Sequence, residues 1–345
     1  MSRLLVLEPG ADADRLRAAL LRRGIEGQLV SAPGQGTGPP RRAIVVPGPA
    51  SQHPEADFAG LPGVDAVLAA ASPHPRVDRA PREVPAGPAL LGGPRPVLLA
   101  GPCAVEDEER LEACASAVAA AGAQLLRGGA YKPRSSPYAF QGLGLTGLRL
   151  LRETADRHGL GVVTEALDVR HVEAVAACAD MVQVGSRNMQ NTTLLREIGR
   201  SGRPALLKRG AGSTVEEWLL AAEYLLEAGS PGVVLCERGV RALPQPTRYT
   251  LDLGAAAWLL EHARLPVVVD PSHAAGRREL VPRLARAALA LGAHGLLIEV
   301  HPDPARAASD GLQALSFETF AELARYALPA GAAQTAAEDL YSPPR

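Results

Sequence analysis

Four residues of kinds that bind transition metals stand at or after the ends of short apolar runs. Cys103 follows the run VLLAG, His273 closes VVVDPSH, Glu299 ends GLLIE, and Asp310 lies in the segment after that. A thiolate, an imidazole and two carboxylates suit a borderline divalent ion such as Mn, Fe, Co or Zn, with a position left for a substrate carbonyl. Taken singly, Cys103 would be a small buried hydrophobe and His273 a structural hydrogen-bonding group. The metal interpretation therefore requires that the four side chains meet in space.

Basic side chains gather near the ends of the same runs. Several stand in the glycine-flanked segments RGG, KRG and ERG, where a ligand can approach the backbone closely. So many like charges converge only around anions, and planar guanidinium groups match phosphate and carboxylate oxygens. We therefore expect an anionic ligand, the alternative being ordinary solvent-exposed arginines. The set comprises Arg127, Lys132, Arg134, Arg187, Lys208, Arg209 and Arg238.

Lysine is almost absent from this chain. Among 36 basic residues only Lys132 and Lys208 are lysines, and both belong to the cationic set. Lysine differs from arginine in being compact and able to give up a proton when desolvated, so one of the two is a candidate proton donor. Alternatively, one is a Schiff-base nucleophile whose pKa is lowered by a neighbouring cation such as Arg209, as in lysine-dependent aldolases.

Eight apolar runs alternate with amphipathic segments after residue 96, which predicts a (β/α)8 TIM barrel. The strand candidates are 97–101, 124–129, 161–166, 181–186, 205–210, 233–239, 267–273 and 295–300. The helix candidates are 106–121, 142–157, 169–177, 191–199, 214–227, 250–263, 278–291 and 316–328. In such a barrel the site lies at the carboxyl ends of the strands, where the metal-binding and cationic candidates all stand.

The segment ahead of the barrel has a different pattern. Residues 1–72 alternate apolar runs and helical segments in the order β-α-β-β-α-β, which predicts a small ferredoxin-like domain. Residues 73–96 are rich in proline and glycine and are expected to be a linker. The catalytic barrel is expected over 97–328, followed by a C-terminal tail, 329–345.

Composition excludes several classes of partner. The net charge of −1 and the pI of about 6.7 provide no basic field for nucleic acid or an anionic membrane. No apolar run reaches the length of a membrane span. The four cysteines form no CxxC motif and the N-terminus lacks a secretory pattern, so a reduced, cytoplasmic compartment is expected.

Ordered motifs across the barrel segment resemble a known family, the 3-deoxy-D-arabino-heptulosonate 7-phosphate (DAHP) synthases. The resemblance is to the type I-beta subfamily, which is similar to octulosonate 8-phosphate synthase. The motifs are GPCAVED (101–107), LLRGGAYKPRSSPYAFQGLG (125–144), VQVGSRNMQN (182–191), LLKRG (206–210), CERG (236–239), DPSHAAG (270–276), IEVHPDP (298–304) and SDG (309–311).

This resemblance implies a metal-dependent, aldol-like condensation of phosphoenolpyruvate with erythrose 4-phosphate, which opens the shikimate pathway. Metal ligands would be Cys103, His273, Glu299 and Asp310. Phosphoenolpyruvate would be bound by Arg127, Lys132, Gly185, Ser186, Arg187, Lys208 and Arg238, and the phosphate of erythrose 4-phosphate by Arg134, Ser135 and Ser136. The catalytic candidates are Lys132 as proton donor, Glu165 as the residue that orients water, and His273. Residues 1–72 resemble the ferredoxin-like regulatory domain that is fused to some members of the family, so an aromatic amino-acid effector is expected. A homo-oligomer is also expected.

Three alternatives are considered beside this one. The sister octulosonate 8-phosphate synthases usually read K-A-N-R-S where this chain has Lys132-Pro133-Arg134-Ser135, which favours the four-carbon aldose phosphate over arabinose 5-phosphate. A Schiff-base aldolase would not need the four metal-binding candidates. A catalytically inactive amino-acid sensor would not need the cationic set.

Overall fold

The structure is a computed structural model that describes residues 3–32, 41–46, 55–69, 72–134, 136–243 and 246–328. It divides into two compact units, Met1–Asp78 and Arg79–Arg345. Each unit is described by itself. The predicted tail, 329–345, lies outside the described residues.

The N-terminal unit has the predicted β-α-β-β-α-β order. Its elements are β1 (Arg3–Leu7), α1 (Ala13–Leu21), β2 (Gln28–Ala32), β3 (Arg41–Val46), α2 (Glu55–Ala59) and β4 (Val64–Ala69). The strands pair antiparallel in the order β2-β3-β1-β4. Leu5 and Ile44 from the sheet are fully buried in one core with Leu20 of α1 and Phe58 of α2. This is the ferredoxin-like arrangement that the sequence predicts.

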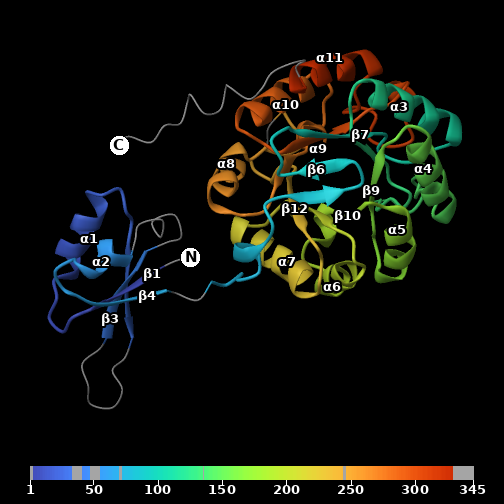
Figure 1. The fold of residues 1–345 in the computed structure, drawn as a ribbon. Coiled ribbons are helices and arrows are strands. Elements are labelled where there is room, and N and C mark those ends of the chain that lie inside the picture. The colour runs from blue at the N-terminus through green and yellow to red at the C-terminus, as the bar shows by residue number, and fades with distance from the viewer. Residues whose placement is uncertain are drawn as a thin grey trace. The chain divides into compact units, whose positions relative to one another are not determined.

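The second unit is a closed barrel of eight parallel strands, as predicted (Figure 1). The strands are β7 (Val97–Gly101), β8 (Leu125–Arg127), β9 (Gly161–Glu165), β10 (Met181–Val184), β11 (Ala205–Lys208), β12 (Val233–Glu237), β13 (Val267–Val269) and β14 (Gly295–Glu299). Every residue of these strands is buried, because the helices cover the outer face and the inner face is filled by side chains.

Helices surround the barrel, and a side chain caps the first turn of most of them. They are α3 (Glu108–Ala120), α4 (Leu145–Arg157), α5 (Val172–Cys178), α6 (Thr192–Arg200), α7 (Val215–Glu227), α8 (Leu253–His262), α9 (Pro271–Ala275), α10 (Val281–Ala290) and α11 (Phe317–Ala327). Thr214 and Glu217 form the capping box that their spacing predicts at the start of α7. The segment 267–273, which the sequence predicts as strand, is strand only over Val267–Val269. The short helix α9 begins at Pro271, because Asp270 caps its first turn.

The expected linker, 73–96, is instead partly folded. It contains a hairpin of β5 (Val84–Ala86) and β6 (Ala89–Leu91), whose alternate side chains are buried in one cluster with barrel residues such as Val97 and Leu125. Gly232, just before β12, leaves room for Val84, since a Cβ there would lie 2.8 Å from that side chain. The hairpin therefore packs across the N-terminal ends of the barrel strands. Its prolines and glycines indicate a tight turn within the barrel unit rather than a spacer between units.

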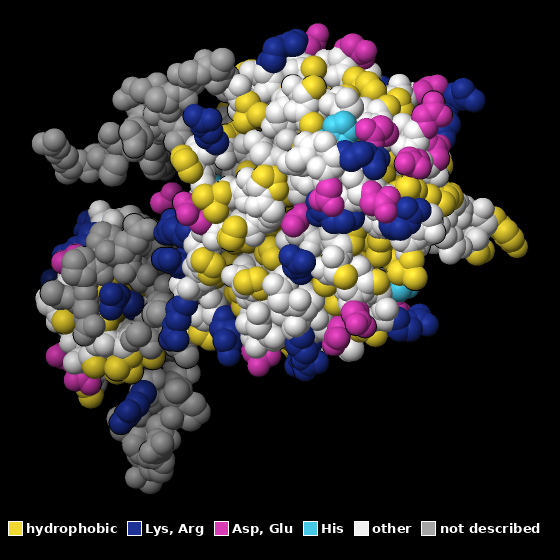
Figure 2. Space-filling model, turned by 45° about the vertical axis from the view of Figure 1, so that its right-hand side comes forward, with side chains coloured by type: hydrophobic (Ala, Val, Ile, Leu, Met, Phe, Trp, Pro, Cys, Tyr) yellow, Lys and Arg dark blue, Asp and Glu magenta, His cyan; other side chains and the backbone are white. Residues whose placement is uncertain are grey.

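The surface agrees with the near-neutral charge of the chain. On the face shown in Figure 2, basic and acidic side chains are interspersed over the barrel unit, with hydrophobic side chains between them. Among the described residues, no helix combines the length and apolar character needed to cross a membrane.

Candidate active site

A cavity of about 830 Å³ opens among residues at the carboxyl ends of the barrel strands. Its lining combines cationic side chains with members of the metal-binding set. The sequence-predicted residues that line it are Arg127, Lys132, Arg134, Ser136, Glu165, Gly185, Ser186, Arg187, Lys208, Arg238, His273 and Asp310. Ser135 lies outside the described residues.

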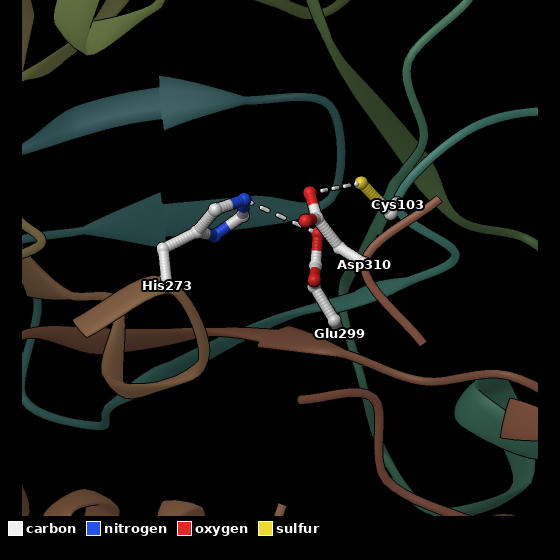
Figure 3. A group of neighbouring side chains, drawn as sticks. All are labelled: Cys103, His273, Glu299 and Asp310. Carbon is white, nitrogen blue, oxygen red and sulfur yellow. Dashed lines mark hydrogen bonds and ion pairs between the residues drawn. The ribbon is translucent and has the colours of Figure 1, made fainter. Parts of the chain in front are cut away.

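The four metal-binding candidates meet beside this cavity, and Figure 3 shows their side chains converging. Cys103, His273, Glu299 and Asp310 each offer one ligand atom, and these atoms all lie within 4.8 Å of one another. The Cys103 thiol donates to Asp310 Oδ2 at 3.2 Å, and His273 Nε2 lies 3.3 Å from Glu299 Oε1. One sulfur, one imidazole nitrogen and two carboxylates at these separations fit a borderline divalent transition-metal ion.

Glu299 is held from two sides. Arg127 donates to its Oε1 at 2.9 Å and Gln313 Nε2 donates to its Oε2 at 2.7 Å. Burial alone would raise the pKa of Glu299, but the nearby His273 and Arg127 outweigh it and lower that pKa. Glu299 is therefore a carboxylate of fixed orientation.

Asp310 adopts an unusual backbone conformation for a residue other than glycine. Its φ is 52°, in the left-handed region that aspartate tolerates better than most residues. Burial would raise the pKa of its carboxyl group, but His273, the thiol of Cys103 and Arg248 together lower it to about 2. The strained backbone and the fixed charge direct Asp310 toward the other three candidates, as expected where local strain serves a site.

Asp270 supports both halves of the site. Its Oδ2 lies 2.7 Å from His273 Nδ1 and also 2.7 Å from Lys208 Nζ. Burial would raise the pKa of Asp270, but these two partners hold it well below its usual range. Burial lowers the pKa of His273 and outweighs the neighbouring carboxylates, which raise it, so the ring releases its proton more readily than a free imidazole. Once neutral, the ring with Nδ1 facing Asp270 presents the Nε2 lone pair to the group.

Lys132 connects the metal-binding group to the cavity. Its Nζ donates to the carbonyl oxygen of Cys103 at 2.9 Å and lies 3.0 Å from the Cys103 sulfur. Burial disfavours the ammonium form, but the neighbouring Cys103 and the Glu299 carboxylate outweigh burial and raise the pKa of Lys132. The pKa of the Cys103 thiol is raised to about 11, mainly by burial and then by Glu299. Lys132 is thus a protonated group at the boundary of two subsites.

Glu165, at the end of β9, is placed by its neighbour on β10. Gln183 Nε2 donates to Glu165 Oε2 at 3.1 Å, and both side chains are buried at the cavity wall. Gly185 allows this position, because a Cβ there would lie only 2.0 Å from Glu165 Oε1. The glycine is therefore needed for space beside the carboxylate.

The remaining cationic candidates are distributed at different depths. Lys208 and Arg238 are nearly inaccessible, at 4% and 6% exposure, whereas Arg187 and Ser136 are exposed at the mouth. Arg187 donates to the carbonyl oxygen of Pro133 at 2.8 Å, which ties the loop after β10 to the loop after β8. Arg238 stacks on the ring of Tyr249 at 4.2 Å. The cavity thus has a buried cationic floor, formed by Arg127, Lys208 and Arg238, and a more open cationic rim that includes Arg134 and Arg187.

Arg209 does not belong to this set, although the sequence suggested it. It pairs with Glu237 at 3.0 Å and with Asp252 at 2.9 Å, and it is not part of the cavity lining. Successive residues along a strand point to opposite faces. Because Lys208 points into the cavity, Arg209 points away from it, and the same alternation directs Glu237 outward and Arg238 inward.

Several site residues escaped the sequence analysis. Asp270 could have been found as an acidic residue three positions before His273, where it caps a helical turn. The other side chains were not singled out by the sequence, although Gln183 lies in the motif 182–191, and they reach the site through the fold. They are Gln183, Arg241, Arg248 and Tyr249 in the cavity lining and Gln313 behind Glu299.

Comparisons with known proteins agree with the resemblance in the motifs. The model of the DAHP synthetase I family matches residues 83–328. The chain is 47% identical over 270 residues to phospho-2-dehydro-3-deoxyheptonate aldolase of Thermotoga maritima, which covers 77% of this chain and 80% of that protein. It is 33% identical over 252 residues to 2-dehydro-3-deoxyphosphooctonate aldolase of Alkalilimnicola ehrlichii, covering 68% and 90% respectively.

The solved structures agree. A crystal structure of phospho-2-dehydro-3-deoxyheptonate aldolase (DAHP synthase) from Thermotoga maritima matches with a TM-score of 0.73 and 42% identity, covering 94% of this chain and 96% of that one. A truncated form of the Thermotoga maritima synthase matches with a TM-score of 0.67 and 45% identity, over 72% and 91% of the two chains. The chain therefore belongs to the DAHP synthetase I family.

Proposed function

We propose that this chain condenses phosphoenolpyruvate with erythrose 4-phosphate to give 3-deoxy-D-arabino-heptulosonate 7-phosphate and phosphate, the first step of the shikimate pathway. The observation that supports this most directly is the meeting of two groups at one end of the barrel. The candidate ligand atoms of the four metal-binding residues lie within 4.8 Å of one another, and a cavity lined by cationic side chains adjoins them. Two small phosphorylated substrates and a polarised aldehyde need this combination.

Cys103, His273, Glu299 and Asp310 would hold a divalent ion, with Mn, Fe, Co and Zn as candidates. When bound, the ion supplies Lewis acidity to the aldehyde oxygen of erythrose 4-phosphate. The chain's own part is to orient the ligands: Asp270 faces His273 Nδ1, and Gln313 donates to Glu299.

The buried cationic floor suits phosphoenolpyruvate, which carries a carboxylate and a phosphate. Arg127 and Lys208 are each only 4% exposed, so their charges act with little screening by water. Arg127, Lys132, Lys208 and Arg238 would bind these anionic groups from within the cavity and Arg187 from its mouth, with Gly185 and Ser186 adding contacts beside them.

Proton transfer is assigned to Lys132 and the placement of water to Glu165. Lys132 is protonated and lies between the metal-binding group and the cavity, so it would protonate the aldehyde oxygen as C3 of phosphoenolpyruvate forms the new bond. A water molecule beside Glu165 would add to C2, after which phosphate leaves and the keto group forms. Glu165 is held for this by Gln183.

The more open rim suits the phosphate of the aldose. Arg134 and Ser136 line this part of the cavity, and Ser135 is proposed as their third partner. Arg134 follows Pro133, where octulosonate 8-phosphate synthases usually read A-N. This difference favours erythrose 4-phosphate over arabinose 5-phosphate as acceptor.

A Schiff-base aldolase is disfavoured by the state of Lys132. A nucleophilic lysine needs a lowered pKa, whereas the neighbouring Cys103 and the Glu299 carboxylate outweigh burial and raise the pKa of Lys132. An inactive amino-acid sensor would have no use for the buried cationic floor.

The test is phosphate release from phosphoenolpyruvate with each of the two aldose phosphates, before and after treatment with EDTA. We expect turnover with erythrose 4-phosphate, far less with arabinose 5-phosphate, loss with EDTA and recovery on adding a divalent ion. Undiminished turnover in metal-stripped protein would contradict the metal role, and preference for arabinose 5-phosphate would reverse the substrate assignment.

Two further proposals depend on family resemblance: an aromatic amino-acid effector on the N-terminal unit and a homo-oligomer. Sedimentation with and without tyrosine or phenylalanine tests both.

A cytoplasmic location is proposed on the chemistry of the cysteines. Cys103, Cys114, Cys178 and Cys236 are all unpaired thiols.

A further inference from the structure

Arg248 reaches the metal-binding group from outside it. Its Nη1 lies 3.3 Å from Asp310 Oδ1 and 3.4 Å from Gln313 Oε1. Gln313 in turn donates to Glu299 Oε2 at 2.7 Å. One guanidinium nitrogen thus contacts one metal-binding candidate directly and a second through a buried amide.

The backbone of Arg248 is fixed to the helix that carries His273. Arg248 N donates to Ala275 O at 3.0 Å and Tyr249 N donates to Ala274 O at 2.9 Å. Gly276 permits this contact, because a Cβ there would lie 2.7 Å from Arg248 Cβ and its φ is +66°. The base of the Arg248 side chain is therefore held at a constant distance from α9.

The ion pair itself is too exposed to serve folding. The side chains of Arg248 and Asp310 are 40% and 29% exposed. Ion pairs this accessible add little to folding stability. Asp310, however, has the strained φ of 52°, and a carboxylate on such a backbone needs contacts that fix its direction.

We propose that Arg248 is a positioning residue for the metal-binding group. It sets the direction of Asp310 and, through Gln313, that of Glu299, while its backbone is tied to α9 beside His273. This inference rests on the proposed function only in that the four residues bind a divalent ion. It adds to the site a residue that binds neither the ion nor the reacting atoms.

Charge and positioning predict opposite results for this residue. If Arg248 acted only through its charge, its removal would tighten metal binding, because a cation near the site would no longer be repelled. If Arg248 positions Asp310 and Glu299, its removal weakens metal binding, by about tenfold or more for a lost supporting contact.

The experiment measures the dissociation constant of Mn²⁺ for the full chain without substrates, from the free-ion signal in electron paramagnetic resonance. For R248Q we expect binding weaker by about tenfold or more, with the thermal midpoint of unfolding unchanged. R248K keeps the charge, but its shorter side chain ends before the position of Nη1, so we expect weakened binding there as well. The visible spectrum of Co²⁺ bound to R248Q should also differ from that of wild type, since the ligand geometry changes.

Arg241 provides the matched control. It has the same charge and lines the same cavity, but among the described residues its side chain makes no hydrogen bond or ion pair to the four metal-binding candidates. R241Q should bind Mn²⁺ as wild type does. Unchanged or tighter binding by R248Q beside normal binding by wild type would overturn the positioning role alone. A wild-type protein that binds no divalent ion would overturn the metal site of the proposed function as well.

Discussion

Lys208 and His273 face the same carboxylate oxygen. Lys208 Nζ and His273 Nδ1 each lie 2.7 Å from Asp270 Oδ2, and Asp270 is completely buried. One residue from the cationic floor and one from the metal-binding group therefore share a single carboxylate oxygen. The position of either side chain depends on the charge of Asp270.

Replacing that charge should destabilise the barrel. In D270N the buried ammonium of Lys208 loses its partner, and breaking a buried pair in this way costs about 3–5 kcal/mol. The free energy of unfolding in urea measures this. E153Q is the control, because it removes an exposed pair with Arg149 and should cost no more than about 1 kcal/mol. Equal costs for the two variants would show that Asp270 is not a structural counter-ion.

Lys132→Arg should lose most turnover while folding normally. The ammonium contacts both the carbonyl and the sulfur of Cys103, and a longer, planar guanidinium that does not release its proton cannot reproduce this. We expect kcat to fall by about 100-fold or more, the range for a lost general acid. The reverse change on an exposed helix, R149K, should leave kcat unchanged. Near wild-type activity of K132R would mean that the scarcity of lysine is an accident of composition.

Gly185→Ala should disturb catalysis without unfolding the protein. The new Cβ would lie 2.0 Å from Glu165 Oε1, so the flexible carboxylate must move away from Gln183. We expect kcat to fall by about 100-fold if Glu165 orients water. Gly212 is the control, since a Cβ there meets no atom within 4 Å. If G185A and G212A were equally active, the position of Glu165 would not matter to the reaction.

The raised pKa of the buried Cys114 thiol should lower the stability of the protein at alkaline pH. Burial raises the pKa of this thiol from 9.0 to about 12, with Glu106 adding to it. Above about pH 9 the unfolded chain therefore releases a proton that the folded protein keeps, and stability falls as pH rises. The advantage of wild type over C114A in free energy of unfolding should shrink by about 1.4 kcal/mol between about pH 8 and about pH 10. A constant difference between the two proteins would contradict the raised pKa.

Much of the fold and of the site was predictable from local pattern. The eight barrel strands are short apolar runs, and parallel strands in a closed barrel bring their carboxyl ends together. Cys103, His273, Glu299 and Asp310 could therefore be expected to meet although they are far apart in the sequence. The cationic floor followed from the same geometry.

What the sequence did not reveal depends on contacts between distant segments. Arg209 follows Lys208 and Arg238 follows Glu237, each pair at the end of a strand. Only the alternation of side chains along each strand decides that Arg238 faces the cavity and Arg209 does not. Gln313 and Arg248 carry no pattern of their own, because their roles come from a loop crossing to another loop. The hairpin 84–91 has the composition of a linker and is buried only because the barrel offers it an apolar surface.

That hairpin covers the end of the barrel opposite the cavity. β5 and β6 pack across the N-terminal ends of the strands, and the cavity opens at the end where the strands finish. On the proposed assignment phosphoenolpyruvate occupies the buried floor and the aldose phosphate the exposed rim. An aldose phosphate bound first at the rim would obstruct the path of phosphoenolpyruvate to the floor. We therefore expect phosphoenolpyruvate to bind first, and the product to leave through the rim before the next cycle begins.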